Sequence, residues 1–164
     1  MTKTLKVYKG DDVVASEQGE GKVSVTLSNL EADTTYPKGT YQVAWEENGK
    51  ESSKVDVPQF KTNPILVSGV SFTPETKSIM VNTDDNVEPN IAPSTATNKI
   101  LKYTSEHPEF VTVDENTGAI HGVAEGTSVI TATSTDGSDK SGQISVTVTN
   151  GYGFKAQYIC VFFI

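Results

Sequence analysis

Short stretches in which β-branched or aromatic residues alternate with polar ones recur from the start of the chain, and this pattern limits the fold more than any other feature. Leu5 and Val7 alternate with Lys6 and Tyr8, and the same period of two returns at 23–27 and at 41–45. Alternation of this kind indicates strands with one buried face. No stretch shows an amphipathic period of 3.6 for more than two turns. The sequence therefore predicts an all-β protein.

Composition supports this prediction. Among 164 residues there are 21 Thr and 19 Val but 5 Leu, so residues that suit a pleated surface outnumber helix formers. A chain of this length holds one ordinary domain or two small ones. Many short strands separated by Gly, Asn and Asp turns are typical of β-sandwiches.

The pattern divides the chain into four parts. In the first, a hairpin is expected around Lys9-Gly10-Asp11-Asp12, a strand at 23–27, and an Asn48-Gly49 turn between strands at 41–45 and 55–57. Pro58 and the run Lys61-Thr62-Asn63-Pro64 then break the pattern. The expected parts are a domain at 1–60, a linker at 61–66, a second domain at 67–149 and an apolar tail at 150–164.

In the second domain, turn clusters separate a further series of expected strands. They are placed at 67–72, 79–81, 87–91, 100–103, 110–113, 119–121, 127–133 and 143–149. Gly118 and Gly122 border the strand at 119–121, and Gly126 precedes the strand at 127–133. All three are interpreted as structural, with Gly118 and Gly122 in turns that need a positive φ.

Four blocks of the second domain carry a resemblance. They are Val70-Ser71-Phe72-Thr73-Pro74-Glu75-Thr76, the run from Val111 to Gly122, the run from Glu125 to Ala132, and Ile144-Ser145-Val146-Thr147-Val148. In this order they resemble the bacterial immunoglobulin-like domain, group 2, which is found in bacterial surface adhesins and in bacteriophage structural proteins. The resemblance implies an immunoglobulin-like (Ig-like) β-sandwich over about half of the chain.

The first domain carries a second resemblance. Leu30-Glu31-Ala32-Asp33-Thr34-Thr35-Tyr36 is similar to the Leu-x-Pro-x-Thr-x-Tyr corner of fibronectin type III domains, with Ala32 in place of Pro. This implies a reduced fibronectin-like or Ig-like sandwich in which Tyr36 or Tyr41 is the corner tyrosine. The fold class expected for the whole chain is two tandem Ig-like β-sandwich domains.

Charge excludes some partners. The net charge is −8, and every basic residue is Lys, so the bidentate Arg contacts typical of nucleic-acid binding are absent. Residues 63–149 carry most of the negative charge. The apolar run at 158–164 is far shorter than the ~20 residues needed to cross a bilayer. We expect neither a nucleic-acid partner nor a membrane span.

Established motifs for catalysis and cofactor binding are absent from the sequence. No nucleophile elbow, zinc-protease motif or phosphate loop occurs, His107 and His121 lie in separate motifs, and the single Cys160 has no pairing partner. The runs Asp84-Asp85-Asn86 and Asp136-Gly137-Ser138-Asp139 could offer oxygen ligands to calcium, but the same residues are favoured in turns. We expect no enzyme, no catalytic residue, no cofactor and no metal.

The resemblance implies a non-enzymatic virion protein of a tailed bacteriophage, a head or tail decoration that stabilises the particle or adheres weakly to the host. The N-terminus shows no secretory signal, which favours assembly in the host cytoplasm. Expected partners are a capsid or tail protein and a glycan of the host surface. The alternatives are a module of an exported bacterial adhesin on the cell surface and a carbohydrate-binding accessory domain.

A carbohydrate-binding domain needs exposed aromatic residues. Trp45 alternates with Tyr41 and Val43 and is interpreted as core, which leaves Tyr8, Tyr103 and Tyr152 as possible contacts. The apolar tail is interpreted either as an incidental end or as an extra strand that pairs with a sheet edge.

Overall fold

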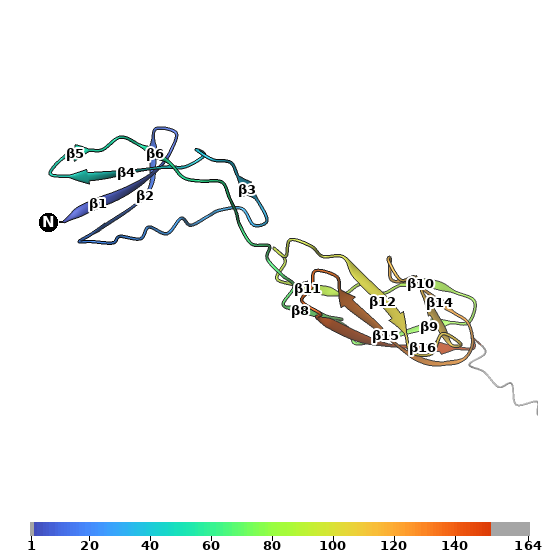
Figure 1. Ribbon diagram of the computed structural model, residues 1–164. Coiled ribbons are helices and arrows are strands. Elements are labelled where there is room, and N and C mark those ends of the chain that lie inside the picture. Colours follow the sequence, from blue (N-terminus) through green and yellow to red (C-terminus); the bar gives the residue numbers. More distant parts are fainter. Residues whose placement is uncertain (1, 152–164) are drawn as a thin grey trace, which may run out of the picture. The chain divides into compact units, whose positions relative to one another are not determined.

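An antiparallel hairpin opens the chain in the computed structural model, which describes residues 2–151 (Figure 1). Strand β1 (Lys3–Lys9) pairs with β2 (Asp12–Gly19) across the turn at Gly10, whose φ is +64°. The other edge of β1 pairs antiparallel with β4 (Gln42–Glu47), so β1 lies between two neighbours. The hairpin predicted at Lys9–Asp12 is confirmed.

The rest of this first sheet is built on β4. Both β5 (Lys50–Glu51) and β6 (Val55–Asp56) pair with it antiparallel. Asn48 and Gly49 have φ values of +50° and +73°, as a type I′ hairpin turn requires. Away from this sheet, β3 (Thr35–Tyr36) pairs with β7 (Phe60–Lys61).

The strand predicted at 23–27 does not form. Residues 21–34 contain no strand, although Val23, Val25 and Leu27 are half-buried and the residues between them are exposed. The side chains at 23–27 thus alternate as in a strand, although this segment pairs with no neighbouring strand. A period of two shows which side chains turn inward, but a strand also needs a neighbouring backbone with free donors and acceptors.

Aromatic rings form much of the interior of the first unit. The Tyr36 and Phe60 rings stack with centroids 5.1 Å apart, and Tyr41 lies 5.7 Å from Tyr36. The Tyr36 hydroxyl accepts a hydrogen bond from the Glu31 backbone N–H at 3.0 Å. This bond to a residue slightly upstream is the geometry of a tyrosine corner, so Tyr36, rather than Tyr41, occupies that position.

The second unit consists of three further sheets. Its strands are β8 (Gly69–Ser71), β9 (Thr76–Met80), β10 (Asp84–Asn86), β11 (Asn90–Ala92), β12 (Leu101–Ser105), β13 (Val111–Val113), β14 (Ala119–Gly122), β15 (Gly126–Ser134) and β16 (Ser141–Thr149). A four-stranded sheet has the order β12-β15-β16-β9, in which β16 and β9 are parallel. A three-stranded sheet has the order β10-β14-β13, and β11 pairs with β8.

Most strands predicted here overlap an observed strand, but 87–91 is not one strand. Strand β10 ends at Asn86 and β11 begins at Asn90, and the residues between them are in neither. Val87 in this gap is nonetheless buried, and its N–H donates to the Gly118 carbonyl at 3.0 Å. The apolar residues in this stretch serve the core from a loop, which a hydrophobic pattern cannot distinguish from a strand.

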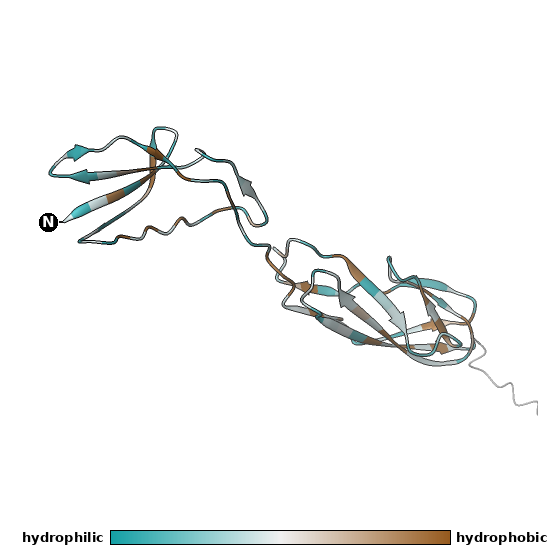
Figure 2. Ribbon diagram, in the orientation of Figure 1, coloured by the Kyte–Doolittle hydropathy of each residue, from teal (hydrophilic) through white to brown (hydrophobic). Residues whose placement is uncertain are grey.

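The core of the second unit lies between its sheets. Along β15, from Ser128 to Ser134, the side chains alternate between buried and half-buried positions. Hydrophobic segments lie on the strands of this unit (Figure 2). Ile130, Val111 and Val146 are completely buried. The core residues are Val67, Val70, Phe72, Ile79, Val87, Ala96, Leu101, Tyr103, Val111, Ile120, Ile130, Ala132, Ile144, Val146 and Val148.

Gly118 and Gly122 were both predicted to be structural, but the fold requires glycine at these two positions for different reasons. Gly118 has a φ of +74°, as predicted for its turn. The prediction of a positive φ at Gly122 is wrong: Gly122 lies at the end of β14, and a Cβ there would stand 2.5 Å from the Met80 carbonyl oxygen. Close approach of another backbone requires glycine at this position.

The chain divides into two compact units, with the boundary in the sequence between Ile65 and Leu66. The linker predicted at 61–66 overlaps the first unit, because Lys61 is in β7 and Asn63 accepts a hydrogen bond from the Asp33 N–H. Residues 2–151 contain no helix long and apolar enough to cross a membrane. The predicted tail lies, from Tyr152 on, outside the described residues.

Candidate functional site

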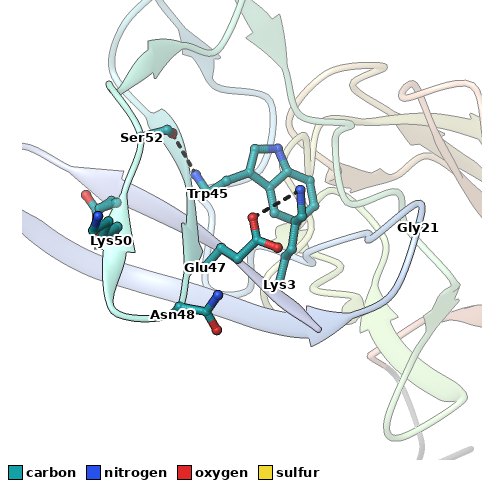
Figure 3. Close-up of a pocket in the computed structure, with 8 residues that line it drawn as sticks. Lys3, Gly21, Trp45, Glu47, Asn48, Lys50 and Ser52 are labelled. Atoms are coloured by element: carbon teal, nitrogen blue, oxygen red, sulfur yellow. Dashed lines mark hydrogen bonds and ion pairs between the residues drawn. The ribbon is translucent and has the colours of Figure 1, made fainter. Parts of the chain in front are cut away.

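A depression of about 870 Å³ opens on the first unit, around the indole of Trp45 (Figure 3). It is lined by Lys3, Gly21, Trp45, Glu47, Asn48, Lys50, Glu51 and Ser52. The lining comes from the start of β1, the segment after β2, the end of β4, the turn after it, β5 and the residue that follows β5. This depression combines an exposed aromatic ring with several charged and amide groups.

The prediction that Trp45 belongs to the core is wrong. Trp45 is 37% exposed, whereas Tyr41 on the same face of the chain is 5% exposed. Trp45 lies opposite Leu5 in the β1–β4 register, near the end of the sheet. Ala44, on the opposite face of the strand, is 2% exposed, so alternation alone does not show which face is covered. On the face of Tyr41 and Trp45, cover decreases towards the end of the strand.

Ser52 fixes the backbone at Trp45 from the neighbouring segment. The Ser52 Oγ accepts the Trp45 N–H at 3.0 Å, and the Trp45 carbonyl accepts the Ser52 N–H at 2.8 Å. Both backbone polar groups of Trp45 are therefore paired with one residue. This arrangement fixes the position of the strand that carries the indole.

An ion pair lies beside the indole. Lys3 Nζ is 3.4 Å from Glu47 Oε2, and Figure 3 shows both side chains next to the Trp45 ring. Asn48 occupies the adjoining turn with its φ of +50°. The lining thus presents carboxylate acceptors, ammonium donors and an amide around one aromatic surface.

A denser set of charges borders the depression at Glu51. Glu51 Oε2 accepts hydrogen bonds from the Tyr8 hydroxyl at 2.6 Å and from Lys6 Nζ at 3.2 Å, and Lys6 also pairs with Glu46. Hydrogen bonds to Glu46 and Glu51 raise the pKa of Lys6 to about 12, and the Tyr8 hydroxyl lowers the pKa of Glu51. Lys54 Nζ stands 4.1 Å above the Tyr8 ring.

Tyr8 and Tyr103 were predicted as possible surface contacts, and the structure contradicts both predictions. Tyr8 is 6% and Tyr103 is 8% exposed, so both rings belong to the interior. Burial also raises the pKa of Tyr103. Tyr152, the third such residue, lies outside the described residues.

The two histidines each pair with a carboxylate of their own surroundings. His107 Nδ1 is 3.1 Å from Glu109 Oε1, and His121 Nδ1 is 2.6 Å from Asp84 Oδ1. Strand β14 carries His121 opposite Asp84 of β10, so the register explains the second pair. The structure does not bring the two histidines into one cluster of metal-binding side chains within residues 2–151.

The two acidic runs considered for calcium use their carboxylates within the fold. Asp85 pairs with Lys77 at 2.8 Å, which lowers the pKa of Asp85. Asp136 Oδ2 accepts the Val67 N–H at 2.6 Å, and Oδ1 accepts hydrogen bonds from the Ser138 hydroxyl and N–H. These bonds, with that of the Ser138 hydroxyl the strongest, lower the pKa of Asp136 to about 2. Asp136 thus ties the β15–β16 turn to the start of the second unit.

Comparison with protein families finds a match over most of the second unit, to the family that its four sequence blocks resemble. Residues 66–144 match the family model of the bacterial Ig-like domain, group 2. The match covers just under half of the chain.

Two relatives differ sharply in kind. The chain is 40% identical over 85 residues to an Ig-like virion protein of Serratia phage KSP90. This alignment covers 52% of this chain and 33% of that protein. Over 167 residues it is 35% identical to a 3-O-alpha-D-galactosyl-alpha-L-arabinofuranosidase of Bifidobacterium longum subsp. longum, covering 88% of this chain and 14% of that protein. The chain therefore spans a third or less of each relative.

Among solved structures, the fold is similar to domains 1–6 of the surface layer protein SbsC. The TM-score is 0.50 at 18% identity, over 90% of this chain and 28% of that chain. The described chain is all-strand, with no helix in residues 2–151, and the fold class is Ig-like.

Proposed function

We propose that the protein is a non-enzymatic Ig-like module of a bacteriophage virion, in which two tandem sandwiches decorate a head or tail protein. The 40% identity with a phage virion protein carries this proposal. Within the proposal, the module stabilises the particle or adheres weakly to the host surface, and it is located on the virion. Its function is attachment, without a chemical step.

The edge of β2 is the surface we propose for attachment to the particle. Within the described residues, β2 is the outer strand of its sheet, so one row of its backbone groups has no strand partner. Val13 and Val14 on this strand are 50% and 46% exposed. An open edge with apolar side chains on both faces favours the addition of a strand from another protein.

Co-sedimentation with phage particles that lack the protein tests the proposal, with host cell walls as the competing target. Saturable binding to the particles is expected, and the double variant Val13→Lys, Val14→Lys should abolish it because charged edge residues oppose strand addition. Ile100→Lys, at a position 65% exposed in the other unit, is the matched control. Binding to cell walls alone would refute the virion assignment.

A second candidate is supported by the relative whose name is that of an arabinofuranosidase, a carbohydrate-active enzyme. In this alternative the chain is an accessory domain of a longer bacterial protein, either a carbohydrate-binding domain or a module of an exported adhesin at the cell surface. Binding to cell walls together with no binding to particles would favour it.

A further inference from the structure

We propose that the depression around Trp45 binds a neutral oligosaccharide, with one sugar ring stacked on the indole. The inference rests on the proposed function, because it supplies the host-surface ligand of the virion module. It also places that ligand on the first unit, which the group 2 family match does not cover.

The indole provides the stacking surface. Trp45 is the single Trp of the chain. It lies on β4, an inner strand of the β2-β1-β4-β5 sheet, yet more than a third of its surface remains in contact with solvent. An indole is a flat, electron-rich apolar surface. The C–H face of a sugar ring is flat and carries partial positive charge, so the two surfaces fit each other.

The surrounding side chains match the hydroxyl groups of a sugar. A hydroxyl needs both donors and acceptors nearby, and the lining offers ammonium donors from Lys3 and Lys50, a carboxylate acceptor from Glu47 and an amide from Asn48. Figure 3 shows Lys3 and Glu47 beside the indole, whereas Asn48 and Lys50 line the depression further from the ring. A hydrophobic surface with a few convergent polar groups is the general form of a small-ligand site.

The balance of charge indicates a neutral ligand. Lys3 and Glu47, the charged groups beside the indole, pair with each other at 3.4 Å, so the immediate surroundings of the ring present no excess of either sign. The protein as a whole carries a charge of −8, which repels polyanions at a distance. A neutral sugar encounters neither obstacle.

The site is formed before any ligand arrives. Ser52 pairs with both backbone groups of Trp45, and the Asn48-Gly49 turn sets the position of the adjacent amide. Its volume of about 870 Å³ falls within the roughly 300–1,000 Å³ typical of ligand pockets. Binding therefore requires little ordering of the protein, which lowers its entropic cost.

Tryptophan fluorescence gives a direct test, because the only indole lies in the site. The purified full chain is titrated with neutral hexasaccharides of glucose, galactose, mannose and N-acetylglucosamine, and with an oligogalacturonate of equal length as the anionic control. We expect a saturable change of Trp45 emission with at least one neutral sugar and none with the anion. No saturable change with any neutral sugar would overturn the proposal.

Calorimetry on variants then locates the binding. Trp45→Ala should weaken binding by about tenfold or more, the loss of one stacked aromatic contact, and Trp45→Phe should retain part of the affinity. Val55→Ala, exposed on the same sheet, is the matched control, and circular dichroism confirms that each variant is folded. Unchanged affinity in a folded Trp45→Ala would also overturn the proposal.

The two proposals fail separately in these assays. Trp45→Ala should bind phage particles as well as the original protein, because Trp45 pairs with Leu5 whereas Val13 pairs with Tyr8, towards the opposite end of β1. Sugar binding without particle binding would refute the virion assignment and leave the sugar site standing. Particle binding without sugar binding would refute the sugar site and leave the virion assignment standing.

Discussion

The two units of this protein are held together by different means. Among the described residues, the first unit buries four hydrophobic side chains and the second buries fifteen. The first unit adds a stacked cluster of Tyr36, Tyr41 and Phe60 and a set of hydrogen-bonded charges around Glu51. The second unit packs aliphatic residues between sheets. A small unit can thus use a few rings and polar bonds where a larger one uses a continuous apolar core.

The largest effect is expected from Tyr41→Ala. Removing this buried ring should cost about 3–5 kcal/mol, and a unit with so small a core has little stability in reserve. The first unit should unfold while the second stays folded. Trp45 fluorescence reports the first unit and limited proteolysis should cut within residues 1–65. A variant whose first unit resists protease like the original would show that the aromatic cluster is dispensable.

Ile130→Ala probes the larger core. Ile130 is completely buried on β15, so the free energy of unfolding of the second unit should fall by about 2–5 kcal/mol. Urea unfolding followed by circular dichroism should show an earlier transition, without any change in the Trp45 signal. Ile100→Ala in the same unit, where the side chain is 65% exposed, is the control and should change little. An equal effect of both substitutions would contradict this account of the core.

Tyr36→Phe isolates the corner hydrogen bond of the first unit. The ring and its stacking on Phe60 remain, but the Glu31 N–H loses its acceptor. We expect a loss of about 1 kcal/mol in the free energy of unfolding of this unit, measured by urea titration with Trp45 fluorescence. Unchanged stability would mean that water replaces the hydroxyl at no cost.

Asp136 makes a smaller, pH-dependent contribution to the second unit. Its pKa is about 2 in the folded protein and 3.8 in its ordinary state, so its stabilising effect is complete well above pH 3.8 and is lost as the pH falls towards 2. Asp136→Asn should therefore be less stable than the original near pH 6, with the difference shrinking at pH 2. Urea midpoints at both pH values measure this. A difference independent of pH would exclude the carboxylate charge as its source.

The sequence predicted the second unit better than the first. Strands β15 and β16 are long, alternate regularly and have partners on both sides, so their period of two determines their structure. Val23, Val25 and Leu27 show the same period without forming a strand, since a pattern of side chains does not reveal whether a neighbouring backbone is available. Local pattern is informative where the sheet is complete.

The candidate site was missed for a related reason. Alternation placed Trp45 on the face of Tyr41 and Val43, but the extent of the layer above that face depends on distant segments. The sequence did carry a signal that Trp45 is exposed. Trp45 is the single Trp and comes shortly before the Asn48-Gly49 turn, and side chains near the ends of strands are the least covered. Gly122 shows a comparable limit, since only the fold reveals the Met80 carbonyl beside it.

The parallel pairing of β9 with β16 has a mechanical consequence. Thr76 lies opposite Ser145 and Met80 opposite Thr149, so the chain enters β9 at one end of this pair and leaves β16 at the other. A pull applied at Thr76 and at Thr149 would slide these strands along each other and load their evenly spaced hydrogen bonds together. Such shear resists rupture far better than peeling bonds apart singly. A domain so connected can transmit tension along the chain without extending.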